Sequence, residues 1–121
     1  MKKIIYLTLF SIVLFAFTSQ SPYNYHQEAT LTGVASEIEY KTPSGDSYHT
    51  YILKLAQTIN INANNEWEAK QEVIEIQLSI PDHKMLRFKD KTVRVTGELF
   101  GAVNEHHRRE VCLKVNEIGN E

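Results

Sequence analysis

The sequence predicts a mainly β protein, folded as a small five-stranded Greek-key barrel with a short helix between its third and fourth strands. Five segments alternate apolar and polar residues with a period of two, as half-buried strands do. One short stretch with helical features follows Pro81, between the third and fourth of these segments. A change of alternation at a glycine in the first segment indicates a β-bulge, which bends a strand sharply.

The first predicted strand spans residues 29–40. Leu31 occupies one face, and after Gly33 the residues of opposite parity take that face, namely Val34, Ser36, Ile38 and Tyr40. Because the phase changes by one residue at a glycine, we expect a β-bulge at Gly33 and Val34. Segment 41–47 contains Pro43 and Gly45 and is therefore predicted to be a turn.

The second and third predicted strands span residues 48–55 and 73–80. Each has one apolar face, formed by Tyr51, Leu53 and Leu55 in the second and by Ile74, Ile76, Leu78 and Ile80 in the third. The polar segment 60–70 between them carries Trp67. Because tryptophan is mostly buried in folded proteins, we expect Trp67 to be a lid packed on the barrel; the alternative is a platform for a ligand.

Pro81 opens the predicted helix, whose apolar side is expected to plug one end of the barrel through Met85, Leu86 and Phe88. The fourth and fifth strands begin at Lys91 and Val111. Their inward-facing residues are Val93, Val95, Gly97, Leu99, Val111, Leu113 and Val115. Cys112 and Lys114 therefore fall on the outer face of the last strand.

Five strands, a bulged first strand and a helix between the third and fourth match the barrel known as the OB-fold. Closure into a barrel also removes the exposed strand edges that would otherwise pair with other chains. The alternative architecture is an open β-sandwich.

Residues 1–21 have the pattern of a secretory signal peptide: a basic tip, an apolar run at 4–17 and then small residues. The run is shorter than the roughly 20 residues that span a bilayer, although a retained N-terminal anchor is the alternative. No cysteine lies near the boundary, which excludes bacterial lipoprotein processing. We therefore expect a single domain at 22–121, exported to the periplasm or secreted, with no stable membrane anchor after cleavage.

Net charge and cysteine content limit the classes of binding partner and the oligomeric states that we expect. Loss of Lys2 and Lys3 from the 13 basic residues leaves 11 against 15 acidic ones, a formal net charge of −4. Nucleic acid is not expected as a partner, because phosphate backbones demand a basic face. Cys112 is the single cysteine, so an intramolecular disulfide is impossible. We expect a monomer with a free, partly covered thiol; the alternative is a dimer linked through Cys112.

Four ordered runs carry a resemblance to a known family: YILKL at 51–55, EIQL at 75–78, KTVRVTGELF at 91–100 and the histidine pair at 106–107. The chain resembles an uncharacterised bacterial family of small, typically exported proteins, known only as a domain of unknown function (number four-four-three-one). The resemblance covers nearly all of the mature chain and implies no activity, because none is established for the family.

The chain departs from the family pattern at several positions. Asn60 stands where members commonly carry a cysteine, and further family histidines are replaced here by Gly101, Val103 and Arg108. Only His106 and His107 match the histidine loop of the family. A metal role carried over from the family therefore lacks most of its ligands in this chain.

In OB-folds the loop between the first two strands lies near the loop between the last two, and ligands bind between them. The sequence therefore predicts a binding rim formed by the loops 41–49 and 101–109, with Asp46, Tyr48, His49, His106, His107, Arg108 and Arg109 as site residues. Guanidinium groups pair bidentately with carboxylates. We expect a non-catalytic binding module for a protein or glycan of the cell envelope.

The alternative function is a periplasmic metal-binding domain that holds zinc or copper through His49, His106 and His107. Two adjacent arginines oppose this, since fixed positive charges beside a divalent cation are unfavourable unless carboxylates offset them. No nucleophile elbow, phosphate-binding glycine loop or HExxH motif is present, so we expect neither an enzyme nor a resident cofactor.

Overall fold

A computed structural model describes residues 21–121, and the predicted signal peptide, apart from Ser21, lies outside the described residues. Within this range the protein is mainly β, with one six-stranded sheet and one four-residue helix. No helix in the described range is long and apolar enough to cross a membrane. The elements in chain order are β1 (Tyr23–Asn24), β2 (Glu28–Lys41), β3 (Ser47–Asn62), β4 (Lys70–Ser79), α2 (Asp82–Met85), β5 (Thr92–Gly101) and β6 (Val111–Asn120).

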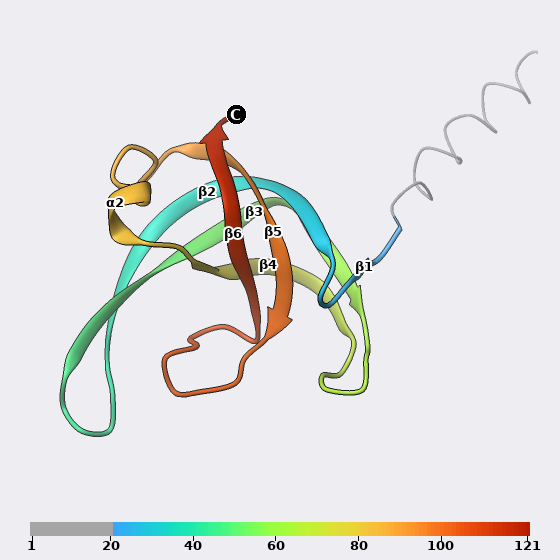
Figure 1. Ribbon diagram of the computed structural model, residues 1–121, viewed down its shortest axis with the longest axis horizontal. Coiled ribbons are helices and arrows are strands. Elements are labelled where there is room, and N and C mark those ends of the chain that lie inside the picture. The colour runs from blue at the N-terminus through green and yellow to red at the C-terminus, as the bar shows by residue number, and fades with distance from the viewer. Residues whose placement is uncertain (1–20) are drawn as a thin grey trace, which may run out of the picture.

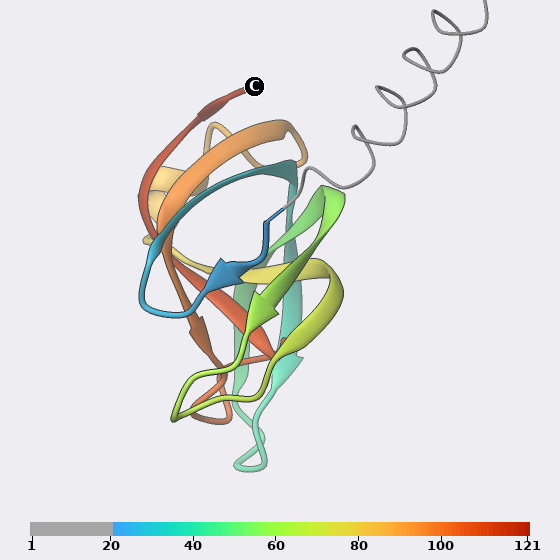
Figure 2. The same ribbon diagram turned by 90° about the vertical axis from the view of Figure 1, so that its right-hand side faces the viewer.

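The strand pairings run in a circuit. β2 is antiparallel to both β3 and β5, and β6 is antiparallel to β5. β4 is antiparallel to β3 and parallel to β6. A path from β3 through β2, β5, β6 and β4 therefore returns to β3, and Figures 1 and 2 show these strands curving around a common centre. The two-residue β1, which was not expected, adds to β3 in parallel.

The predicted alternation is confirmed over most of the core. The inner face of β3 buries Tyr51, Leu53 and Leu55, as expected. The other strands contribute Ile76, Leu78, Val93, Val95, Leu99, Val111 and Leu113, all with at most 2% of their surface exposed. Burial of apolar area on this scale is the main force that holds such a domain together.

The predicted bulge at Gly33 is wrong. Residues of one parity, Ala29, Leu31, Gly33 and Ala35, are buried without interruption, whereas Val34 is 44% exposed. Gly33 pairs in register with Leu55 on one side and Val93 on the other, and an added Cβ would clash with a backbone carbonyl of β3. The glycine marks a close approach of neighbouring strands, which is the other common reason for glycine within a strand.

A register shift does occur between β5 and β6. Thr96 pairs with Glu117 while Gly97 pairs with Val115, so Asn116 is an extra residue in β6. A two-against-one arrangement of this kind bends the strand that carries the extra residue.

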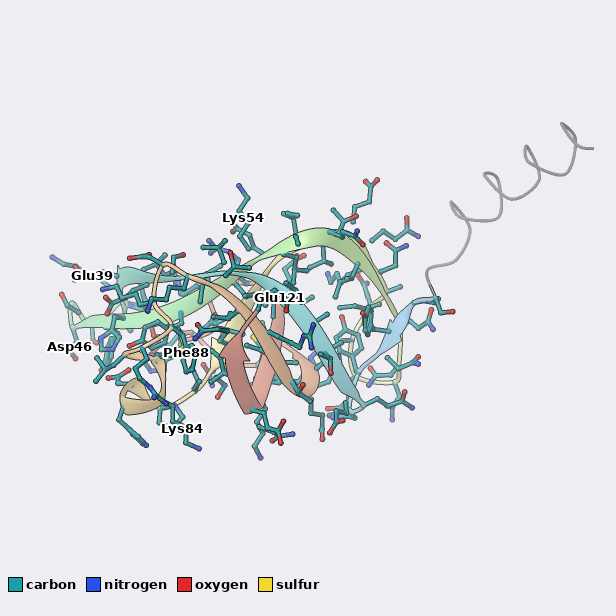
Figure 3. The ribbon with its side chains drawn as sticks, turned by 90° about the horizontal axis from the view of Figure 1, so that it is seen from above. Glu39, Asp46, Lys54, Lys84, Phe88 and Glu121 are labelled. Carbon is teal, nitrogen blue, oxygen red and sulfur yellow. The ribbon has the colours of Figure 1, made fainter. Side chains whose placement is uncertain are left out.

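Two apolar residues lie on different faces from those predicted. The β3–β4 register shifts between Lys54 and Ile59, so that Val73 packs against the core and Ile74 is 40% exposed. At the end of α2 and just after it, Met85 and Phe88 are buried as the predicted plug, but Leu86 is 78% exposed. Figure 3 shows Phe88 directed towards the strands and Lys84 directed away from them.

Trp67 is a lid, as the sequence predicts. Its ring is partly buried and packs against the core cluster. It lies over Gly101 at the end of β5, where any Cβ would clash with the indole ring. Because glycine has no Cβ, position 101 allows the indole ring to pack directly against the backbone of β5.

Candidate functional site

The two predicted loops lie at the same end of the molecule. Pairing of β3 with β4 ends at Tyr51 and Leu78, and beyond it the β2–β3 hairpin continues as a two-stranded arm to the turn at 42–46. The β5–β6 loop, residues 102–110, lies at this end too, whereas the C-terminus lies at the opposite end (Figures 1 and 2). The loop folds over the outer face of β4, as its contacts below show.

Four side chains from the arm and the loop form one group, called here the Tyr–His–Arg cluster: Tyr40, Tyr48, His106 and Arg108. The two tyrosines are cross-strand partners with ring centroids 5.9 Å apart and planes at 27°. His106 stands edge-on to Tyr48, with centroids 4.8 Å apart, and its Nδ1 lies 3.0 Å from the Tyr40 hydroxyl. The Arg108 guanidinium lies 5.1 Å from the centre of the Tyr40 ring, within cation–π range.

The two arginines of the loop have different surroundings. Arg109 Nε donates to Glu75 Oε1 at 2.8 Å, so its charge is paired inside the protein. Arg108 forms no ion pair with any carboxylate in residues 21–121; besides its contact with the Tyr40 ring, its guanidinium donates to the Glu105 carbonyl oxygen at 3.5 Å. The positive charge of Arg108 is therefore free to meet a ligand.

Gln77 fixes the loop on the sheet. It lies on the outer face of β4 yet is buried, and its Nε2 donates to Thr50 Oγ1 at 3.1 Å and to the His106 carbonyl at 3.0 Å. Its Oε1 accepts a hydrogen bond from the Arg108 backbone N–H. One buried amide thus holds the backbone at both His106 and Arg108. Sequence reasoning missed this role, because alternation predicts only that Gln77 faces outward.

Cys112 lies beneath the same loop. It is on the outer face, as predicted, but is only 1% exposed, and its Sγ lies 3.9 Å from the Arg109 carbonyl oxygen of the loop. This burial raises the pKa of the thiol to about 12. A disulfide between two chains would require displacement of the loop, which makes Cys112 a poor link in the folded protein.

His107 is turned away from the Tyr–His–Arg cluster. Its ring packs edge-on against Phe100, and its Nδ1 accepts a hydrogen bond from the Val103 backbone N–H at 2.9 Å. Burial, and secondly the nearby His106, lowers the pKa of His107 below its usual value.

His49 belongs to a different group. It points to the other face of β3, where its Nε2 lies 2.9 Å from Asp82 Oδ1, and the Tyr51 hydroxyl donates to that same oxygen at 3.0 Å. The hydrogen bond to Asp82 raises the pKa of His49 and, together with that from Tyr51, lowers the pKa of Asp82. Burial raises the pKa of Tyr51 to about 12.

Asp46 is separated from the other predicted site residues. It lies at the far tip of the β2–β3 hairpin (Figure 3), and its carboxylate accepts a hydrogen bond from the Ser44 hydroxyl at 3.2 Å. Of the seven predicted residues, the structure brings together Tyr48, His106 and Arg108, and adds Tyr40. The remaining four, Asp46, His49, His107 and Arg109, have other partners.

A small cavity of about 250 Å³ adjoins the Tyr–His–Arg cluster. Its lining includes Thr50 and Ser79 from the outer faces of β3 and β4, together with Tyr40, His106 and His107. His49 and Asp82 also reach it. Within residues 21–121, however, no group of three or more His, Cys, Asp or Glu side chains is arranged to hold a metal ion.

No curated protein matches this chain. The family comparison gives one result that bears on the site. Over residues 75–119, which run from β4 to β6 and include Gln77, His106 and Arg108, the chain matches the family model described as Domain of unknown function (DUF4431), and the resemblance indicated by the sequence motifs is thereby confirmed for this segment.

Proposed function

We propose that the protein is an exported, non-catalytic binding module that captures a protein or glycan of the cell envelope on the Tyr–His–Arg cluster. One observation carries the proposal: an unpaired guanidinium and a half-exposed aromatic pair, drawn from a hairpin and a distant loop, are held side by side on one face. Exposed aromatic and arginine side chains are the residues that dominate binding energy at protein surfaces.

We further infer that the architecture is the five-stranded Greek-key barrel of the OB-fold. The circuit of pairings through β2, β3, β4, β6 and β5, with α2 between β4 and β5, supports it over an open sandwich. In that fold, ligands bind across the second and third strands and between the two loops described here. The Tyr–His–Arg cluster, drawn from the β2–β3 hairpin and the β5–β6 loop, supports a ligand at this position.

The rigidity of the face favours binding. Gln77 fixes the loop backbone, and the tyrosines stand on paired strands, so little conformational entropy would be lost when a ligand docks. The thiol of Cys112, with its raised pKa and its cover, is unsuited to act as a nucleophile, because the thiolate is the reactive form. These features support a binding role in preference to a catalytic one.

The test is capture from envelope extracts. Protein purified after expression of the full chain is immobilised and offered detergent-solubilised envelope material, and retained proteins and sugars are both analysed. Arg108→Glu reverses the free charge and is expected to abolish capture. Arg87→Glu is the matched control, since Arg87 also lies over an aromatic ring, that of Phe88, and is not part of the Tyr–His–Arg cluster. Equal capture by Arg108→Glu and the unmodified protein would refute the site.

A further inference from the structure

We propose that the Tyr–His–Arg cluster binds a sugar that bears a carboxylate, a uronate-type pyranose. This inference rests on the proposed binding function and names the ligand class for the same face. Three features carry it: a free guanidinium, a flat exposed ring near it and an adjoining small cavity whose wall includes hydroxyl groups.

The guanidinium selects the charge of the ligand. In the described chain, Arg94 is paired with Glu121 and Arg109 with Glu75, whereas Arg108 has no carboxylate partner. Its backbone is fixed by Gln77, so the side chain rises from a defined point at the rim of the site. A planar guanidinium presents a fork of N–H donors that matches a carboxylate bidentately, which makes a carboxylate the natural partner.

The aromatic pair selects a ligand with a flat apolar face. Tyr48 is 41% exposed, and Tyr40 lies beside it on the neighbouring strand. The face of a tyrosine ring carries negative charge and attracts weakly positive C–H groups, which a pyranose presents along one side. His106 supports Tyr48 from the edge, leaving the tyrosine fixed in its orientation.

The cavity limits the size and polarity of the ligand. At about 250 Å³ it is smaller than the roughly 300 Å³ at which sites for drug-sized molecules begin, so it fits one sugar ring. Thr50 and Ser79 on its wall carry hydroxyl groups that suit the hydroxyls of a sugar. The carboxylate of Asp82 also reaches the cavity, but its Oδ1 is engaged by His49 and Tyr51.

A single carboxylate also agrees with the charge of the whole domain. Residues 22–121 carry a formal net charge of −4, which repels polyanions such as nucleic acids. A sugar residue with one carboxylate meets Arg108 without presenting a line of negative charges. An acidic peptide could satisfy the arginine but lacks the flat C–H face that Tyr48 would cover, and we treat it as an outcome of the test.

The experiment is calorimetric titration of the protein, purified after expression of the full chain, with two probes. The methyl glycoside of galacturonic acid carries a single carboxylate, and its methyl ester keeps the ring but caps the charge. We expect esterification to weaken binding about tenfold or more, the usual value of a hydrogen bond to a charged group. Arg108→Gln should weaken binding of the acid to the level of the ester and leave the ester unchanged. Tyr48→Ala should weaken both probes alike.

Two further variants guard the interpretation. Arg87→Gln, outside the Tyr–His–Arg cluster and its cavity, should leave the Kd of both probes unchanged. Arg108→Lys keeps the charge but loses the planar fork, so its Kd for the acid should lie between those of the unmodified protein and Arg108→Gln. It also serves as the second variant if Arg108→Gln folds poorly. Equal binding of acid and ester, or an acid-to-ester ratio that Arg108→Gln does not change, would overturn the proposal.

The outcomes separate this inference from the proposed function. If neither probe binds while capture from envelope extracts still depends on Tyr48 and Arg108, the binding function stands and the sugar is wrong; retention of an acidic peptide would then be the sign of the alternative ligand. If capture also fails to depend on these residues, both proposals fall.

Discussion

Two histidine-bearing aromatic groups in this protein use similar rings for opposite purposes. In the first, called here the Trp67 latch (Tyr25, His26, Glu66, Trp67 and Glu98), the indole centroid lies 5.1 Å from Tyr25 and 5.2 Å from His26. The two nitrogens of His26 lie 2.7 Å from Glu66 and 3.4 Å from Glu98. In the Tyr–His–Arg cluster, by contrast, the cation has no carboxylate and a tyrosine stands half exposed.

The two groups differ in whether their polar and charged side chains have partners within the protein. In the Trp67 latch, His26 has partners in Glu66 and Glu98, and the Tyr25 hydroxyl donates to the Glu68 carbonyl at 3.1 Å. Such a group ties the β3–β4 loop to the core. The Tyr–His–Arg cluster is equally well positioned but leaves a charge and a ring face unsatisfied, which is what a binding surface requires.

Truncation of one aromatic residue in each group should give the largest contrast. Trp67→Ala removes a ring that packs on the core and over Gly101, and we expect a loss of about 3 kcal/mol, the lower end for a large aromatic because Trp67 is only partly buried. Tyr48→Ala should change the unfolding free energy by less than about 0.5 kcal/mol. Urea denaturation of both variants measures the contrast, and similar losses would remove the distinction between latch and binding surface.

Removal of the amide that holds the binding loop should have the next largest effect. Gln77→Leu leaves the His106 carbonyl and the Arg108 N–H without their partner, and we expect a loss of about 2 kcal/mol. The loop should then open more often, so that a thiol reagent reaches Cys112 faster. Gln71→Leu, at the exposed start of the same strand, is the control. A labelling rate unchanged in Gln77→Leu would show that the loop is held by other contacts.

Gln77 and Cys112 illustrate what the sequence could and could not predict. Alternation correctly put both on the outer face of their strands, because strand parity depends on local pattern alone. Their burial depends on a loop that returns over the sheet, and nothing in the period of a strand reports what lies above it. The loop residues were identified, but the buried amide beneath them was not.

Gly33 and His49 show the same limit in two other forms. A glycine within a strand predicts either a bulge or a close approach, and only the neighbouring strand decides between them. The predicted proximity of the two loops correctly placed Tyr48 next to His106. The same prediction was wrong for His49, which does not join Tyr48 and His106. Adjacent residues of a strand point to opposite faces, so His49 contacts Asp82 instead.

The Trp67 latch should depend on pH through His26. The hydrogen bond to Glu66, with a smaller contribution from Glu98, raises the pKa of His26 above 6.5. A raised pKa in the folded state means that the stabilisation is fully present below about pH 6.5 and is lost as the pH rises through the folded value. His26→Gln should therefore destabilise the protein at pH 5.5 and have little effect at pH 9, as measured by thermal unfolding. The same substitution at exposed His83 is the control; a pH-independent loss in His26→Gln would contradict the latch.

His107, next to the Tyr–His–Arg cluster, should titrate in the opposite sense and with the smallest effect. Burial lowers its pKa, so the unfolded chain takes up a proton near pH 6.5 that the folded chain still refuses, and stability is lost as the pH falls. NMR titration of the imidazole Cε1–H should give His107 a midpoint below 6.5 and His26 a midpoint above it. Because burial is the larger cause and the charge of His106 the smaller, His106→Gln should leave most of the lowering in place. A His107 midpoint restored to 6.5 in His106→Gln would mean that the charge of His106, and not burial, is the main cause of the lowered pKa of His107.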